Sequence, residues 1–173
     1  MAAHILVAYA TRNGSTAEIA LAVAKELEKT GAAVTVSDMK TVLSVAGYTA
    51  VVIGAPLYMG SLVKEVAQFA GKHKERLRNM PVAAFAVGIA PKSPDPGAVG
   101  QATAALHAAI DPLTPVASIV FAGKLDPAKL SFVQRKMTEL VRSPVGDFRD
   151  WVAIAAWARD LPGKMGLIPA PKD

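Results

Sequence analysis

Polar side chains that could hold a phosphate crowd into one short segment near the start of the chain, Thr11-Arg12-Asn13-Gly14-Ser15-Thr16. An apolar run at residues 5–8 precedes this segment, and an amphipathic helical pattern with Ile19, Val23 and Leu27 on one face follows it. A buried strand that leads through a polar turn into a helix makes an anion site. The reason is that the first backbone N–H groups of a helix lack partners and its dipole adds partial positive charge there. We therefore predict that the segment binds a phosphate group.

The residue types in this turn exclude two common nucleotide-binding loops. A Walker A loop ends in Gly-Lys followed by Ser or Thr, and no lysine follows Gly14. A dinucleotide-binding turn has three glycines within six residues, whereas this turn has a single glycine. Hydroxyl and backbone N–H groups can still hold a phosphate, because each charge-assisted hydrogen bond contributes roughly 1.5–3 kcal/mol. The simpler alternative is that Asn13-Gly14 forms only a tight turn and that Ser15 only caps the helix.

Composition limits the classes of protein to which the chain can belong. Its 173 residues suit one domain, which we place at residues 1–162, followed by a flexible tail at residues 163–173. Although 52% of the residues are hydrophobic, no apolar stretch reaches the ~18 residues of a membrane-spanning helix, and we expect no secretion signal. The absence of cysteine excludes disulfides, thiolate catalysis and Cys-ligated metal centres. The histidines (His4, His73 and His107) lack metal-ligand spacing, so we expect surface or strand-end positions for them and no metal site.

Apolar runs and amphipathic patterns alternate along the chain. The runs are continuous, which is typical of parallel strands buried on both faces. We predict strands at residues 5–8, 33–36, 50–53, 82–87 and 116–122. We predict a first helix that ends at Gly31 and a second that spans residues 61–78. A third has an apolar face formed by Val99, Thr103, Leu106 and Ile110, and a last helix follows the fifth strand. This alternation predicts an α/β three-layer sandwich whose five-stranded parallel sheet has the order 2-1-3-4-5.

Ligands of such sheets bind beyond the carboxyl ends of the strands, where the strand order switches between the first and third strands. Three predicted loops meet there: the polar segment, the segment Pro56-Leu57-Tyr58-Met59-Gly60, and the irregular proline-rich segment from Ile89 to Gly97. Tyr58 and Met59 could lie against a planar ring, unless they only cap the core beneath the loop. Together the loops fit a ligand with a phosphate at one end and a flat ring at the other.

An extra segment separates the fifth strand from the last helix. Asp126-Pro127 is a suitable helix start. The apolar stripe that follows consists of Leu130, Val133, Met137 and Leu140. We expect this helix to pack on the edge of the sheet, and the alternatives are a cover over the ring of the ligand or a contact with a membrane surface. The final helix has Asp147 as its expected cap, and its predicted buried face consists of Trp151, Ile154, Ala158 and Leu161.

The sequence resembles the flavodoxin superfamily, whose members bind flavin mononucleotide (FMN). Its first loop is similar to the flavin phosphate loop Thr/Ser-x-Thr/Asn-Gly-x-Thr. Asn13, Gly14 and Thr16 match constrained positions of that loop, and Arg12 matches a free one. Within the superfamily the chain is most similar to the menaquinone-dependent protoporphyrinogen oxidase family. The similarity to that family is carried by residues 51–60, Phe69, His73, residues 77–81, residues 121–126 and Asp150-Trp151.

This resemblance implies a flavodoxin-like oxidoreductase with FMN as its cofactor. It implies oxidation of protoporphyrinogen, or a similar reduced substrate, with a quinone-type acceptor in heme biosynthesis. The phosphate would be held by Thr11, Arg12, Asn13, Gly14, Ser15 and Thr16. The ring would be lined by Pro56, Leu57, Tyr58, Met59, Gly60, Gly88 and Ile89. No side chain is indicated as a catalytic acid or base.

Two other functions stay open: an electron carrier between redox proteins, and an FMN-binding regulatory domain without turnover. The net charge of +5 argues against the carrier, because flavodoxins that carry electrons are usually acidic. A basic surface suits a porphyrinogen, which carries carboxylates, and a quinone, which lies in a membrane. Nucleic acid is a poorer match, because no recognition motif is present. We expect a cytoplasmic protein with a peripheral contact to the inner face of the membrane, and the sequence leaves its oligomeric state open.

Overall fold

The computed structural model describes residues 3–125 and 146–167 of the chain. The described strands are β1 (His4–Tyr9), β2 (Ala33–Asp38), β3 (Ala50–Tyr58), β4 (Ser61–Leu62), β5 (Val82–Gly88), β6 (Ala117–Ala122), β7 (Lys124–Leu125) and β8 (Gly146–Asp147). The described helices are α1 (Ser15–Glu28), α2 (Lys64–Lys72), α3 (Lys74–Leu77), α4 (Ala98–Ile110) and α6 (Trp151–Lys164), with two short 3-10 helices, η1 (Met39–Thr41) and η2 (Ala90–Lys92).

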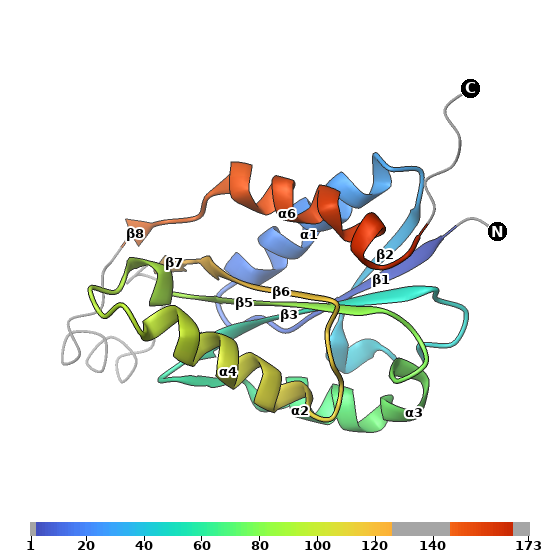
Figure 1. The fold of residues 1–173 in the computed structure, drawn as a ribbon, viewed down its shortest axis with the longest axis horizontal. Helices are drawn as coiled ribbons and strands as arrows, with labels where there is room; N and C mark the ends of the chain where they lie inside the picture. The colour runs from blue at the N-terminus through green and yellow to red at the C-terminus, as the bar shows by residue number, and fades with distance from the viewer. Residues whose placement is uncertain (1–2, 126–145, 168–173) are drawn as a thin grey trace.

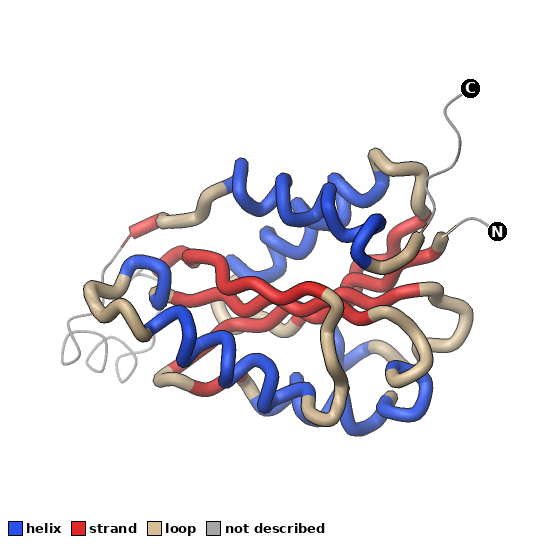
Figure 2. Tube along the Cα trace, viewed as in Figure 1, coloured by secondary structure: helices blue, strands red, loops and turns tan. Residues whose placement is uncertain are grey.

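The long strands form a parallel sheet between two layers of helices. Their order is β2-β1-β3-β5-β6, which confirms the predicted order for five long strands, and the short β4 pairs with β3 outside this path. Figure 1 shows α1 and α6 on one face of the sheet and α2, α3 and α4 on the other. Figure 2 shows the same three layers by element type, with the sheet in the middle. The fold is therefore the flavodoxin-like α/β sandwich expected from the sequence.

The central strands bury side chains on both faces, because alternate residues of a strand point to opposite sides of a sheet. In β1, Leu6 and Ala8 join the core on the side of α2 and α4, whereas Ile5 and Val7 join the core on the side of α1 and α6. All of these side chains are fully buried. The continuous apolar run of β1 therefore follows from its central place in the sheet.

The segment after β3 differs from the prediction. β3 does not stop at Gly54 but continues through Pro56 to Tyr58 and turns back into β4. Proline is tolerated there because β1 ends at Tyr9, opposite Gly54, and leaves Pro56 paired on one side only. The predicted helix at residues 61–78 is likewise interrupted. Its first residues form β4, and His73 has non-helical dihedral angles that separate α2 from α3.

The predicted buried face of the final helix is wrong at its first residue. The buried tryptophan of α6 is Trp157, whose ring packs edge-on against Phe121 and Phe85 with centroids 5.6 Å and 6.0 Å away. Trp151 is exposed, because as the first residue of α6 it lies against the preceding loop, where the guanidinium of Arg149 stacks on its ring. The rest of the predicted face, from Ile154 to Leu161, is buried as expected.

The ends of α6 also differ from the prediction. Asp150 caps the helix in place of Asp147, since its Oδ1 accepts a hydrogen bond from the N–H of Ala153 at 3.0 Å. The helix also continues past Pro162 to Lys164. Met165 is buried in the same core, so the helix and the turn after it pack on the domain.

Smaller differences concern α4, the proline-rich segment and the extra segment. The buried face of α4 consists of Ala102, Leu106 and Ile110, and Val99 is exposed. The proline-rich segment expected to be irregular contains η2. β7 and β8 pair in antiparallel fashion on either side of the extra segment. The helix predicted after Asp126, with its stripe from Leu130 to Leu140, lies outside the described residues.

Close packing around β3 predicts the effect of one substitution. A Cβ atom at Gly54 would lie 2.0 Å from Cζ of Phe85, whose side chain is fully buried. We expect Gly54→Ala to lower the free energy of unfolding by about 1–3 kcal/mol, because overpacking forces a rigid core to rearrange. Urea denaturation followed by circular dichroism measures this change.

The matched control is Gly71→Ala in α2. A Cβ atom at Gly71 meets no atom within 4 Å beyond its own helix backbone, and alanine favours a helix over glycine by about 1 kcal/mol. This variant should be as stable as the unmodified chain or more so. Equal stability of the two variants would contradict the packing assigned to Gly54.

Candidate functional site

The predicted phosphate-binding segment lies between β1 and α1, at the carboxyl edge of the sheet (Figure 1). Gly14 has a φ of +91°, a conformation that glycine adopts without strain, and it turns the chain from the strand into the helix. The Thr11 hydroxyl accepts a hydrogen bond from the N–H of Gly14 at 3.0 Å and stabilises this turn. No side-chain cap is formed at the start of α1 by the described residues. The N–H groups of its first turn are therefore available to an anion.

The predicted ring-binding segment forms the tip of the β3–β4 hairpin. Met59 and Gly60 have φ angles of +50° and +81°, as in the two-residue turns that match the twist of hairpin strands. Met59 is exposed and Tyr58 is partly exposed at this tip. Nδ2 of Asn13 donates a hydrogen bond to Oη of Tyr58 at 3.3 Å, so the two predicted loops are in direct contact. Burial raises the pKa of Tyr58 above its ordinary value of 10.0.

The end of β5 completes this edge of the sheet. Gly88 is the last residue of β5, and a Cβ atom placed there would lie 3.4 Å from Cβ of Leu57. The N–H of Gly123 donates to the carbonyl oxygen of Gly88 at 3.0 Å, which holds the chain after β6 against the same strand end. Ile89 follows Gly88 and is exposed at the rim. The predicted residues Leu57, Gly88 and Ile89 therefore lie together beside the hairpin.

A nearly buried ion pair joins the phosphate loop to α2. Nη2 of Arg12 lies 2.9 Å from Oε1 and 2.8 Å from Oε2 of Glu65. The Glu65 side chain is only 8% exposed, and that of Arg12 is 33% exposed. The hydrogen bonds from Arg12 lower the pKa of Glu65 and outweigh burial, which acts in the opposite direction. The carboxylate therefore stays charged at neutral pH and holds the backbone of the loop against α2.

A second cluster joins the chain after β8 to the first turn of α1. Arg149, whose side chain is 6% exposed, binds Asp147 through Nε at 2.9 Å and through Nη2 at 2.8 Å. Its Nη1 forms an ion pair with Glu18, which lies in the first turn of α1. The hydrogen bonds from Arg149 lower the pKa of Asp147 to about 2. Arg149 thus holds the chain after β8 against the first turn of α1.

All of the predicted site residues lie at the carboxyl ends of β1, β3 and β5, in the turns that follow them, or in the first turn of α1. The arrangement fits FMN. Uncapped N–H groups and the hydroxyls of Thr11 and Ser15 suit a phosphate, and the exposed tip with Tyr58 and Met59 suits a flat ring. The three strands are neighbours in the sheet, so one ligand could contact all three loops.

Sequence reasoning missed two residues that organise this edge. The sequence places Glu65 only within a predicted helix, although an acidic residue among buried neighbours in a helix requires a cationic partner. The available signal for Arg149 is that three charged residues, Asp147, Arg149 and Asp150, lie close together in the sequence at the start of the last helix. In both cases the partner is distant in the sequence. The sequence therefore indicates that an ion-pair partner is needed but does not identify it.

The described residues contain no group of three or more histidine and acidic side chains that could hold a metal ion. Among the described helices, none combines the length and the apolar character needed to cross a membrane.

Comparison with known proteins defines the class of this chain. Its fold is similar to that of the flavodoxin from Streptococcus pneumoniae TIGR4, with a TM-score of 0.56 and 17% identity over 94% of this chain and 99% of that one. A mutant flavodoxin from Pseudomonas aeruginosa matches with a TM-score of 0.55 and 12% identity, over 94% of this chain and 99% of that one. These structures show that the chain has the fold of a flavodoxin.

The family follows from the sequence comparison. Residues 6–150 match the family described as flavodoxin domain, and the chain belongs to this family. The chain is also 27% identical over 168 residues to protoporphyrinogen IX dehydrogenase [quinone] of Escherichia coli strain K12. This match covers 90% of this chain and 93% of that protein. The fold and these matches support a flavodoxin-like FMN oxidoreductase.

The Arg12–Glu65 ion pair predicts how acid affects stability. The pKa of Glu65 in the folded chain lies below its ordinary value of 4.5. The pair therefore contributes its full stability above that pH, and the contribution is lost as the pH falls further and the folded chain takes up the proton. We expect Glu65→Gln to lower the free energy of unfolding at neutral pH by about 1–3 kcal/mol, because Arg12 loses a charged partner.

The measurement is urea denaturation of both proteins at a series of pH values from about 7 to about 3. The difference between them should be constant in the upper part of this range and should shrink below a pH of about 4.5. Glu75→Gln, on an exposed side chain of α3, is the control and should change stability little. A difference between the unmodified chain and Glu65→Gln that does not vary with pH would refute the assignment.

Proposed function

We propose that this chain is an FMN-dependent oxidoreductase that oxidises protoporphyrinogen, or a similar reduced substrate, with a quinone-type acceptor. The observation that carries the proposal is the contact between the two halves of the site: Asn13 of the phosphate loop bonds Tyr58 of the hairpin tip at 3.3 Å. This contact supports a single ligand with a phosphate at one end and a ring at the other. The name of the Escherichia coli relative supports the choice of substrate and acceptor.

The residues of the phosphate loop would bind one end of FMN. The hydroxyls of Thr11, Ser15 and Thr16 would donate to phosphate oxygens, together with the N–H groups of the first turn of α1. Arg12 would add positive charge beside this position while Glu65 holds its guanidinium in place. Asn13 and Gly14 would shape the turn.

The residues of the other two strand ends would position the ring. Tyr58 and Met59 would lie against its face, over Pro56, Leu57 and Gly60 of the hairpin. Gly88 and Ile89 would border it on the side of β5. Bound FMN supplies the transfer of a hydride or of electrons, and the chain supplies binding and orientation. We assign no side chain as a general acid or base.

The charge of the chain supports this substrate class. A net charge of +5 favours anionic ligands, and porphyrinogens carry carboxylates. The same charge would draw the protein toward an anionic membrane surface, where a quinone is available. We propose a cytoplasmic location with peripheral contact to the inner face of the membrane.

The phosphate assignment is tested by the double variant Ser15→Ala/Thr16→Ala. Loss of two charge-assisted hydrogen bonds should weaken FMN binding by roughly 100-fold or more. Quenching of FMN fluorescence on titration measures the affinity, and circular dichroism verifies that the variant is folded. Thr30→Ala, at the opposite end of the same helical segment, is the control and should bind FMN as the unmodified chain does. A folded double variant with unchanged affinity would exclude the assigned phosphate site.

The reaction is tested with the purified, FMN-loaded chain. Oxidation of protoporphyrinogen IX should require the added quinone, and it should be lost in the Ser15→Ala/Thr16→Ala variant at limiting FMN. Porphyrin fluorescence follows the reaction. FMN binding without this turnover would contradict the proposed reaction. Fast electron exchange with a redox protein would then identify a carrier, and the absence of any exchange would identify a regulatory domain.

A further inference from the structure

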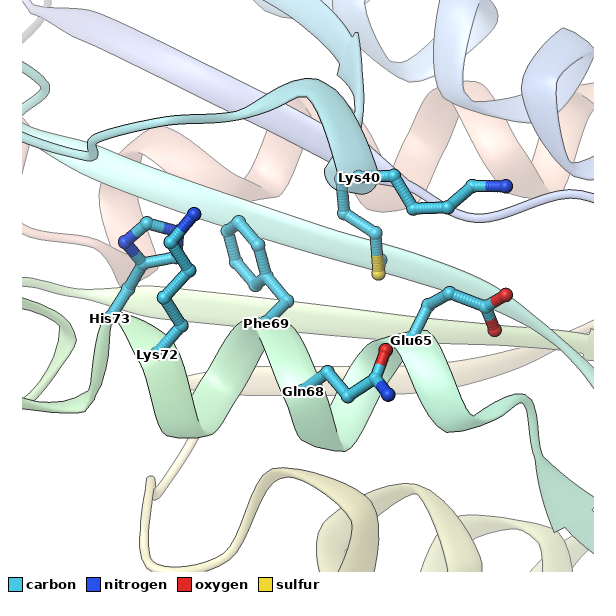
Figure 3. A pocket seen from close by; sticks show the side chains of 7 residues that line it. Lys40, Glu65, Gln68, Phe69, Lys72 and His73 are labelled. Atoms are coloured by element: carbon cyan, nitrogen blue, oxygen red, sulfur yellow. The ribbon is translucent and has the colours of Figure 1, made fainter.

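A pocket separate from the proposed FMN site opens between η1 and α2. It has a volume of about 210 Å³. It is lined by Met39, Lys40, Glu65, Gln68, Phe69, Lys72 and His73. Figure 3 shows that its α2 residues follow one side of the helix from Glu65 to Lys72, and that His73 comes directly after the helix. The Arg12–Glu65 ion pair lies between this pocket and the phosphate loop.

The middle of the pocket is apolar. Phe69 and Met39 are core residues that also line it, so an occupant would contact an aromatic ring and a thioether. The volume is smaller than the roughly 300–1,000 Å³ of sites for drug-sized ligands. The occupant is therefore a small molecule, no larger than one substituted ring.

The rim of the pocket has an excess of positive charge. Lys40 lies above Glu65, and Lys72 lies beside His73 (Figure 3). Within the described part of the chain, neither lysine forms an ion pair, whereas Glu65 is already paired with Arg12. An occupant with one negative charge would therefore meet an ammonium group that has no partner.

His73 lines the end of the pocket beside Lys72 (Figure 3). His73 is 8% exposed, although the sequence predicts a surface or strand-end position for it. Its Nε2 is buried and has no hydrogen-bond partner among the described residues. Burial and the nearby Lys72 ammonium lower the pKa of His73, so the positive charge at this end of the pocket comes from Lys72.

We propose that the pocket between η1 and α2 binds a small organic anion, with its apolar body against Phe69 and Met39 and a carboxylate at the Lys72–His73 end. This site is distinct from the proposed phosphate position, because Glu65 at the end of the pocket is already paired with Arg12 of the Thr11–Thr16 turn. The site therefore exists whatever reaction the FMN site performs.

Benzoate is the probe, because it combines one carboxylate with a ring of suitable size. It is titrated into the full chain saturated with FMN, and NMR chemical shifts of the protein report where it binds. We expect shifts at Phe69, His73 and the Met39 methyl group, and we expect the uncharged analogue benzamide to bind more weakly by roughly fivefold.

Two variants of exposed lysines on α2 test whether the carboxylate of benzoate binds beside Lys72. Lys72→Met should weaken benzoate binding by roughly fivefold, because the carboxylate loses its partly exposed ion-pair partner. Lys64→Met, at the opposite end of α2 and outside the pocket, should leave binding unchanged. The proposal is overturned if benzamide binds as well as benzoate, if both variants weaken binding equally, or if the shifts lie away from the pocket.

Discussion

The parallel pairing of β1 between β2 and β3 is the constraint on which the rest of this structure depends. The chain leaves β1 through α1 on one face of the sheet and leaves β3 through α2 on the other (Figure 1). Neither of these two helices therefore covers the edge between the carboxyl ends of the two strands. The turn after β1 and the hairpin after β3 emerge side by side, close enough for Asn13 to bond Tyr58. Burial of β1 on both faces holds its register and so keeps this edge in place.

Two ion-pair clusters hold the segments of this edge together. Arg12 and Glu65 join the phosphate loop to α2, and Arg149 joins the chain after β8 to Glu18 in α1. The carboxylates of Glu65 and Asp147 both have lowered pKa values, because an arginine donates hydrogen bonds to the charged form. One partner of each pair, Glu65 in the first and Arg149 in the second, is largely shielded from water, so these interactions are screened less than fully exposed pairs. Loops that would otherwise move freely thus keep the geometry that a phosphate and a ring require.

The same edge explains how a chain without an identified acid or base can support redox chemistry. FMN carries the reactive atoms, and the protein contributes uncapped N–H groups, hydroxyls and an exposed aromatic tip. Specificity for a substrate must then come from charge and shape around the ring. Positive charge is present overall, and part of it borders the pocket between η1 and α2. Glu65 connects this pocket to the proposed FMN site. Its side chain lines the pocket, and its ion pair holds Arg12 of the turn after β1.

The sequence by itself determined the parallel sheet, its strand order and the position of the polar turn between β1 and α1. These follow from local patterns: continuous apolar runs, helical periodicity and a polar turn before a helix. Tertiary structure decided that β3 continues through Pro56, because the end of β1 at Tyr9 removes one neighbouring strand. It also decided that Trp157 and not Trp151 packs in the core, that Arg12 pairs with Glu65, and that Arg149 pairs with Glu18. Each of these depends on residues far apart in the sequence, as with Arg12 and Glu65 at 53 positions and Glu18 and Arg149 at 131, or on where a neighbouring element ends. Local periodicity carries no information about either.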